Sequence, residues 1–159
     1  MYSKSEVTLV DVTLTTLAAA IANNEVISQA IEIPYVSGFD GGSAIIQSIT
    51  LNSDDAETPA IDLVFSQVNT ALASAASETV GSGVADLDTA GASVLGFVSL
   101  SNYTNMVDFM TATKANVGLV VKCADDKKSI FVHAINRSGS NFTPTGTDDL
   151  HLHVGFIRS

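Results

Sequence analysis

Three histidines are the side chains best suited to chemistry in this sequence. His151 and His153 flank Leu152 in a run that alternates like a β-strand, so both imidazoles point to one face about 7 Å apart. Histidines at that spacing can supply two ligands to one metal ion. A hairpin through residues 137–149 would bring His133 close to His151 and complete a cluster. Because the sequence does not fix the hairpin register, the alternative is that all three are polar strand positions or interface histidines.

Acidic loops offer a second kind of metal site. One polar loop carries Asp54, Asp55 and Glu57, and another segment carries Asp86 and Asp88. Carboxylates in loops are ligands that calcium prefers, but neither group has the spacing of a defined calcium-binding loop. We therefore expect solvated acidic loops, and we assign no metal and no other cofactor to the chain.

No motif marks a catalytic nucleophile. The sequence lacks a Gly-x-Ser-x-Gly elbow, a phosphate-binding Gly-Lys-Ser/Thr loop and a Gly-x-Gly-x-x-Gly turn. The single Cys123 excludes an intramolecular disulfide, and its apolar neighbours predict a buried position. Candidates for an aromatic platform that stacks on sugars are few, namely Tyr2, Tyr35, Tyr103 and Phe142. We expect a protein that is not an enzyme.

Composition excludes several classes of partner. The 159 residues carry a formal net charge of -10, which repels phosphate backbones and anionic lipids, so we expect neither nucleic acid nor membrane as a partner. Hydrophobic residues form 46% of the chain and charged residues 15%, a balance typical of a globular domain. The sequence shows no secretory signal, so we expect a protein that is made and stays unprocessed inside the cell.

Short alternating runs predict an all-β fold. Strands are expected at residues 6–15, 25–33, 44–51, 61–65, 94–100, 117–124, 129–136 and 150–157. Residues 125–128 form a charged turn that is typical of a hairpin. A short helix is predicted at residues 86–92, and residues 103–113 fit either a helix or a strand. About eight short strands favour an antiparallel β-sandwich or jelly roll.

The chain length fits one ordinary domain. We place a single β-sandwich domain at residues 25–159 and interpret residues 1–24 as an N-terminal arm or edge strand. Within that segment, residues 17–23 have the composition of a helical turn. The expected contact surfaces are the N-terminal segment and the loops 37–42, 52–59 and 137–149 at the strand ends. The interface candidates are Asp40, Asp54, Asp55, Glu57, Arg137 and Phe142.

The order of the strand sequences resembles a known protein family. The runs that carry the likeness are Ile-Asp-Leu-Val-Phe at 61–65, Val-Leu-Gly-Phe-Val-Ser at 94–99, Asn-Val-Gly-Leu-Val-Val-Lys at 116–122, Ser-Ile-Phe-Val-His-Ala-Ile at 129–135 and Leu-His-Leu-His-Val-Gly-Phe at 150–156. Over about residues 26–157 the chain is similar to small virion structural proteins of tailed bacteriophages. These runs are framework strands, not a catalytic motif.

The resemblance implies a β-sandwich that decorates or cements the outer surface of the head shell. It implies the major capsid protein as partner and a homo-oligomer on a symmetry axis, with a trimer favoured. Two other interpretations stay open. One is a low-copy neck, tail or head-fibre component of the virion. The other is a carbohydrate- or metal-binding jelly-roll protein, which requires that His133, His151 and His153 converge.

Overall fold

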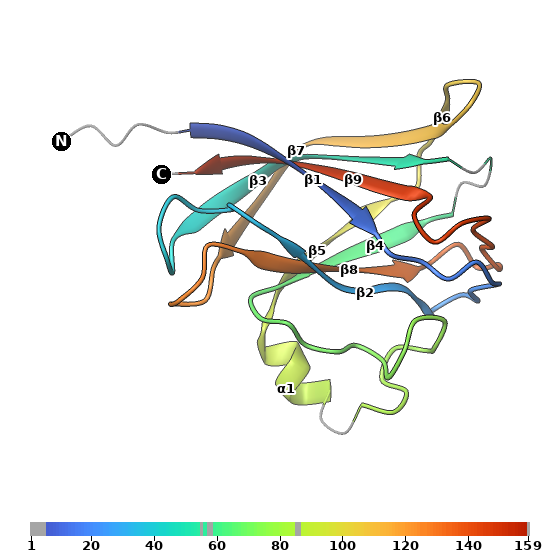
Figure 1. The fold of residues 1–159 in the computed structure, drawn as a ribbon, viewed down its shortest axis with the longest axis horizontal. Helices are drawn as coiled ribbons and strands as arrows, with labels where there is room; N and C mark the ends of the chain where they lie inside the picture. Colours follow the sequence, from blue (N-terminus) through green and yellow to red (C-terminus); the bar gives the residue numbers. More distant parts are fainter. Residues whose placement is uncertain (1–5, 55, 57–58, 85–86, 159) are drawn as a thin grey trace.

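Strands dominate the computed structural model of the chain (Figure 1). The structure describes residues 6–54, 56, 59–84 and 87–158. The described residues form, in chain order, β1 (Glu6–Leu14), β2 (Val26–Ile33), β3 (Ser43–Ser53), β4 (Ile61–Ser66), α1 (Leu87–Ala92), β5 (Val94–Leu100), β6 (Thr104–Asn105), β7 (Met110–Lys122), β8 (Ile130–Asn136) and β9 (Leu150–Arg158). The prediction of an all-β chain is confirmed.

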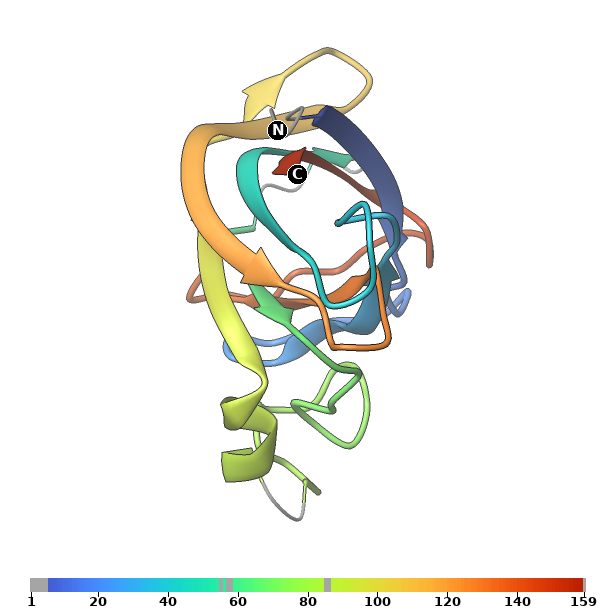
Figure 2. The ribbon, with the colours of Figure 1, turned by 90° about the vertical axis from the view of Figure 1, so that its left-hand side faces the viewer.

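The strands form two antiparallel sheets wrapped around one core (Figure 2). One sheet has the order β1-β9-β3-β7-β6, and the other has the order β2-β8-β4-β5. The first four strands therefore pair with later strands in reverse order: β1 with β9, β2 with β8, β3 with β7 and β4 with β5. Such nested pairing, divided between two sheets, defines a jelly roll, to which β6 adds a two-residue strand beside β7.

The alternation of side chains along each strand builds the core. In β9 the even-numbered residues 150–156 are fully buried, whereas His151, His153 and Ile157 are partly exposed. This is the two-residue period of a strand with one face against the opposite sheet. Phe156 on β9 and Phe65 on β4 come from different sheets and are among the largest fully buried side chains. The alternation places both β9 histidines on the same face, as predicted, and this face points outward.

β1 is an edge strand of the five-stranded sheet, and within the described residues it pairs only with β9. Val10 and Leu14 of β1 belong to the main hydrophobic core, and so does Ile21. Residues 17–23, predicted as a helical turn, are not helical, because Ile21 forms an isolated bridge with Phe142. The N-terminal segment thus contributes both an edge strand and core side chains.

Two connections interpreted as hairpins instead cross from one sheet to the other. Residues 125–128 lie between β7 and β8, and residues 137–149 lie between β8 and β9. β8 lies between β2 and β4, whereas β7 and β9 both flank β3 in the other sheet. Hydrophobic periodicity identifies a strand and its buried face, but it does not identify the strand's neighbours.

The ambiguous residues 103–113 form β6, a turn and the start of β7. Val107 in this turn has a φ of 78°, which is unusual for a β-branched residue. The side-chain oxygen of Asn105 accepts a hydrogen bond of 2.7 Å from the backbone N–H of Val107, which stabilises the turn. The short helix α1 lies where the sequence predicted one.

Candidate functional site

Strand register arranges the outward side chains of the five-stranded sheet in rows. Residues directly opposite each other on antiparallel neighbours point to the same face. Val7 lies opposite Ile157, Ile157 lies opposite Ile45, and Ile45 lies opposite Val120. Val7, Ile45 and Val120 are 84%, 38% and 63% exposed. These four residues, named the apolar row, cross β1, β9, β3 and β7 in succession.

The other end of the same face is polar and hollowed. A cleft of about 300 Å³, named the histidine cleft, is lined by Asp11, Val12, Thr13, Asn52, Asp54, Phe109, His151, Leu152 and His153. Its polar groups come from neighbouring strands, because Asp11 lies opposite His153 and Asn52 lies opposite His151. Phe109, which is 39% exposed, precedes β7 and adds an aromatic side chain.

Each histidine of the cleft contacts a carboxylate. Nδ1 of His153 contacts Oδ1 of Asp11, and Nε2 of His151 lies 3.4 Å from Oδ2 of Asp54. Nδ2 of Asn52 lies 3.3 Å from Nε2 of His153. With Nδ1 of His153 as the donor to Asp11, Nε2 is placed to accept from the side-chain amide of Asn52. The hydrogen bonds hold the polar side chains in fixed orientations.

His133 is not part of this cleft. It belongs to β8 in the other sheet and is fully buried. Its Nε2 lies 3.4 Å from Oγ of Ser66, and its Nδ1 has no hydrogen-bond partner among the described residues. Burial lowers the pKa of His133 to about 4, because the charged imidazolium would lose its hydration. The three-histidine cluster that the sequence left open does not form.

Metal ligands do not gather in the part of the chain that the structure describes. There, no group of three or more His, Cys, Asp or Glu side chains is arranged to hold a metal ion. Asp54 is exposed and contacts His151, and Asp88 is exposed in the first turn of α1. Asp55, Glu57 and Asp86 lie outside the described residues, so the predictions made for them stay predictions.

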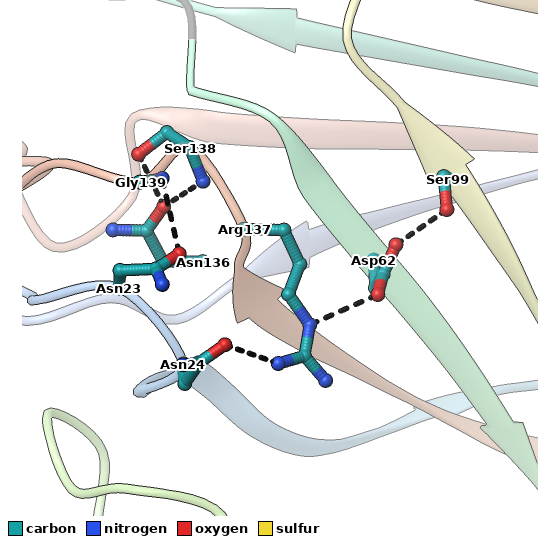
Figure 3. Close-up of polar contacts among 8 residues, drawn as sticks. All are labelled: Asn23, Asn24, Asp62, Ser99, Asn136, Arg137, Ser138 and Gly139. Carbon is teal, nitrogen blue, oxygen red and sulfur yellow. Dashed lines mark hydrogen bonds and ion pairs between the residues drawn. The ribbon is translucent and has the colours of Figure 1, made fainter.

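Arg137, an interface candidate, is held in a polar network (Figure 3). Its Nε donates a 3.0 Å hydrogen bond to Oδ2 of Asp62 on β4, and its Nη1 contacts the side-chain oxygen of Asn24. Asp62 also accepts a hydrogen bond from the hydroxyl of Ser99 on β5. These contacts tie the end of β8 to β4, β5 and the segment before β2, so Arg137 has a structural role.

The remaining candidates divide between the surface and the core. Phe142 is only 1% exposed, so its prediction as a contact or stacking residue is wrong. The β-bridge between Phe142 and Ile21 places the side chain of Phe142 in the core. Asp40 and Tyr35 are exposed in the connection between β2 and β3, and Tyr103 is largely buried. Tyr2 lies outside the described residues.

Sequence reasoning missed the apolar row and half of the histidine cleft. Asp11, Asn52 and Phe109 reach the cleft through strand pairing and a turn, which no local pattern reveals. One signal for the apolar row was present in β1. Both faces of this strand carry apolar residues, because the exposed Val7 and Leu9 alternate with core-facing positions. A strand with only one buried face needs apolar residues on that face alone, so the apolar residues on its outward face are a signal of a contact surface.

Comparisons with known proteins add little to this picture. No protein-family model and no curated protein matches the chain. A solved structure of Desmodium yellow mottle tymovirus aligns over 99% of this chain and 90% of that chain, with 13% sequence identity and a TM-score of 0.29. At that TM-score the match assigns neither fold nor function. Among the described residues, no helix has the length and apolar character needed to cross a membrane.

Proposed function

We propose that this chain is a non-enzymatic virion structural protein that decorates the outer surface of a tailed-bacteriophage head. The framework strands resemble small virion proteins of that kind. The jelly roll is a fold that viral shells use, although lectins and cupins use it as well. Because a fold alone does not define a function, the proposal depends on a surface feature of this chain.

The apolar row is the observation that carries the proposal. Leu9 extends it along β1 and is 64% exposed. Apolar side chains gathered on one face gain free energy when another protein covers them, at about 25 cal/mol per Å² of buried apolar surface. Contiguous patches of this kind mark interaction sites. The row therefore supplies a surface for contact with the major capsid protein.

The mechanism is stabilisation by selective binding. In the proposal, copies of the protein cover seams between capsid subunits that are in register only in the expanded shell. A ligand that binds one state of an equilibrium favours that state by mass action. The protein acts as a homo-oligomer, with a trimer on a symmetry axis of the shell as the preferred arrangement. Its location is the outer surface of the head.

The experiment is reconstitution on heads that lack this protein. Purified protein is mixed with expanded and unexpanded heads, binding is measured by co-sedimentation, and DNA release is followed on heating. We expect saturable binding to expanded heads and a higher temperature of DNA release. Absence of binding to expanded heads would overturn the proposal, and equal binding to both forms would overturn the seam mechanism.

A low-copy neck, tail or head-fibre component is the second candidate, because the same resemblance supports it. The two candidates differ in stoichiometry, so saturation at a few copies per head favours the second. The carbohydrate- or metal-binding alternative, as the sequence left it open, required His133 to join His151 and His153, and the location of His133 in the other sheet removes that support.

A further inference from the structure

The histidine cleft has the features of a ligand site that is separate from the apolar row. Along β1, Val7 of the row and Asp11 of the cleft are four residues apart, which corresponds to about 13 Å of extended strand, and Leu9 lies between them. A ligand could therefore occupy the cleft while another protein covers the row. The cleft volume of about 300 Å³ lies at the lower end of the range for small-molecule sites.

Hydrogen-bond acceptors dominate the free polar groups of the cleft. The contacts with histidine use Oδ1 of Asp11 and Oδ2 of Asp54. Oδ2 of Asp11, Oδ1 of Asp54 and the amide oxygen of Asn52 make no hydrogen bond to another described residue. A complementary ligand must therefore bring several donors at fixed positions. Hydroxyl groups fit this requirement, because each one donates and also accepts.

The apolar part of the cleft restricts the ligand further. Phe109 lines the cleft together with Asp11 and Asp54 and is 39% exposed. A pyranose combines a rim of hydroxyls with an apolar C–H face, so it can satisfy the acceptors and pack against the ring at the same time. An anion would be repelled by Asp11 and Asp54, and the described residues do not form a metal site.

From these groups we propose that the histidine cleft binds a neutral saccharide, such as a terminal sugar of a surface glycan. Asp11, Asp54 and Asn52 accept hydrogen bonds from sugar hydroxyls. His151 and His153 hold the two carboxylates in position, and Phe109 packs against the sugar ring. The proposal goes beyond the structural role of the protein and does not depend on a capsid, because the cleft lies within one chain.

The test is a titration of the isotope-labelled full chain with the methyl glycosides of glucose, galactose, mannose and N-acetylglucosamine, followed by NMR. We expect at least one glycoside to cause saturable shifts at the backbone amides of the cleft residues. Asp11→Asn and Asp54→Asn should each weaken binding about tenfold, because each removes a charged acceptor. Asp126→Asn is the matched control in the turn between β7 and β8, and it should leave the affinity unchanged.

Three results with the glycosides would overturn the saccharide site. They are no saturable shift with any of the four glycosides, shifts outside the cleft, and equal affinity for the wild-type chain and both Asp variants. Tighter binding of N-acetyl-lysine amide than of any glycoside would also overturn it, because the cleft would then be a site for cations. Unchanged amide dispersion in each variant verifies that the fold is intact. The titration uses the isolated chain without phage heads. A negative result would therefore exclude the saccharide site without bearing on the decoration role.

Discussion

Val7 on β1 and Val120 on β7 lie in one row of the five-stranded sheet, connected through Ile157 and Ile45. The two valines are 113 positions apart in the sequence and belong to β1 and β7, which the jelly-roll strand order brings into the same sheet. Both are mostly exposed. The row is therefore a product of the topology, and it is the surface on which the proposed function depends.

The first prediction concerns the double variant Val7→Lys, Val120→Lys. Each exposed substitution should change the free energy of unfolding by no more than about 0.5 kcal/mol. Burial of the two valine side chains in the contact contributes about 3 kcal/mol to the free energy of binding. Because the variant loses this contribution, its affinity for expanded heads should fall about a hundredfold. Val107→Lys is the matched control, since Val107 is 91% exposed in the β6–β7 turn. Head binding of the double variant at wild-type level would show that the row is not the contact surface.

The second prediction concerns Gly96 on β5, which has a φ of +153°. A Cβ at this position would lie 2.7 Å from Cδ1 of Leu119. Leu119 can move its side chain, but the backbone strain remains, so Gly96→Ala should lower the free energy of unfolding by about 2 kcal/mol. Gly91→Ala in α1 is the control, because it has no neighbour within 4 Å and should stabilise by about 0.5 kcal/mol. Chemical denaturation measures both, and equal effects would refute the strain argument.

The third prediction concerns Asn136, which is fully buried at the end of β8. Its Nδ2 donates to the carbonyls of Ile21 and Ser140 at 2.8 and 2.9 Å, and its Oδ1 accepts from the backbone N–H of Ser138 at 3.0 Å. Asn136→Ala should lower the free energy of unfolding by about 3 kcal/mol, because buried polar groups lose their partners. The exposed Asn141→Ala should change it by less than about 0.5 kcal/mol. A loss as small as that of Asn141→Ala would contradict the assigned network.

The fourth prediction concerns pH and His133. Its pKa is about 4 in the folded chain and about 6.5 when unfolded, so the unfolded state takes up a proton first as the pH falls. The neutral His133 therefore makes its full contribution to stability above about pH 6.5. As the pH falls from about 6.5 to 4, the free energy of unfolding decreases by about 3 kcal/mol on account of this residue. His133→Leu should remove this part of the pH dependence. The check is the free energy of unfolding of both proteins at several pH values, and parallel curves would exclude His133 as the cause.

Local sequence patterns predicted the strands and their faces well. The alternation at residues 150–157 placed His151 and His153 on one face, which the structure confirms and shows to be the outward face. The two-sheet class followed from the number and length of the strands. Both predictions succeeded for the same reason. A strand with one face in the core has apolar residues at alternate positions, so its own sequence shows which face is buried.

Strand neighbours could not be predicted in the same way. His153 and Asp11 contact each other across 142 positions of the sequence, and His151 and Asp54 across 97. Phe142 lies in a segment of Gly, Pro, Ser and Thr that is typical of an exposed loop, but its bridge to Ile21 buries it. Such contacts depend on which sheet each strand joins, and a one-residue change of register would reverse every face.

The most direct test of the account is the copy number of this protein in purified virions, measured by quantitative mass spectrometry against the major capsid protein. The decoration role predicts hundreds of copies per particle, in a fixed ratio to the capsid subunits. A handful of copies would place the protein at the neck, tail or vertices, and its absence from the particle would contradict a role in the virion altogether.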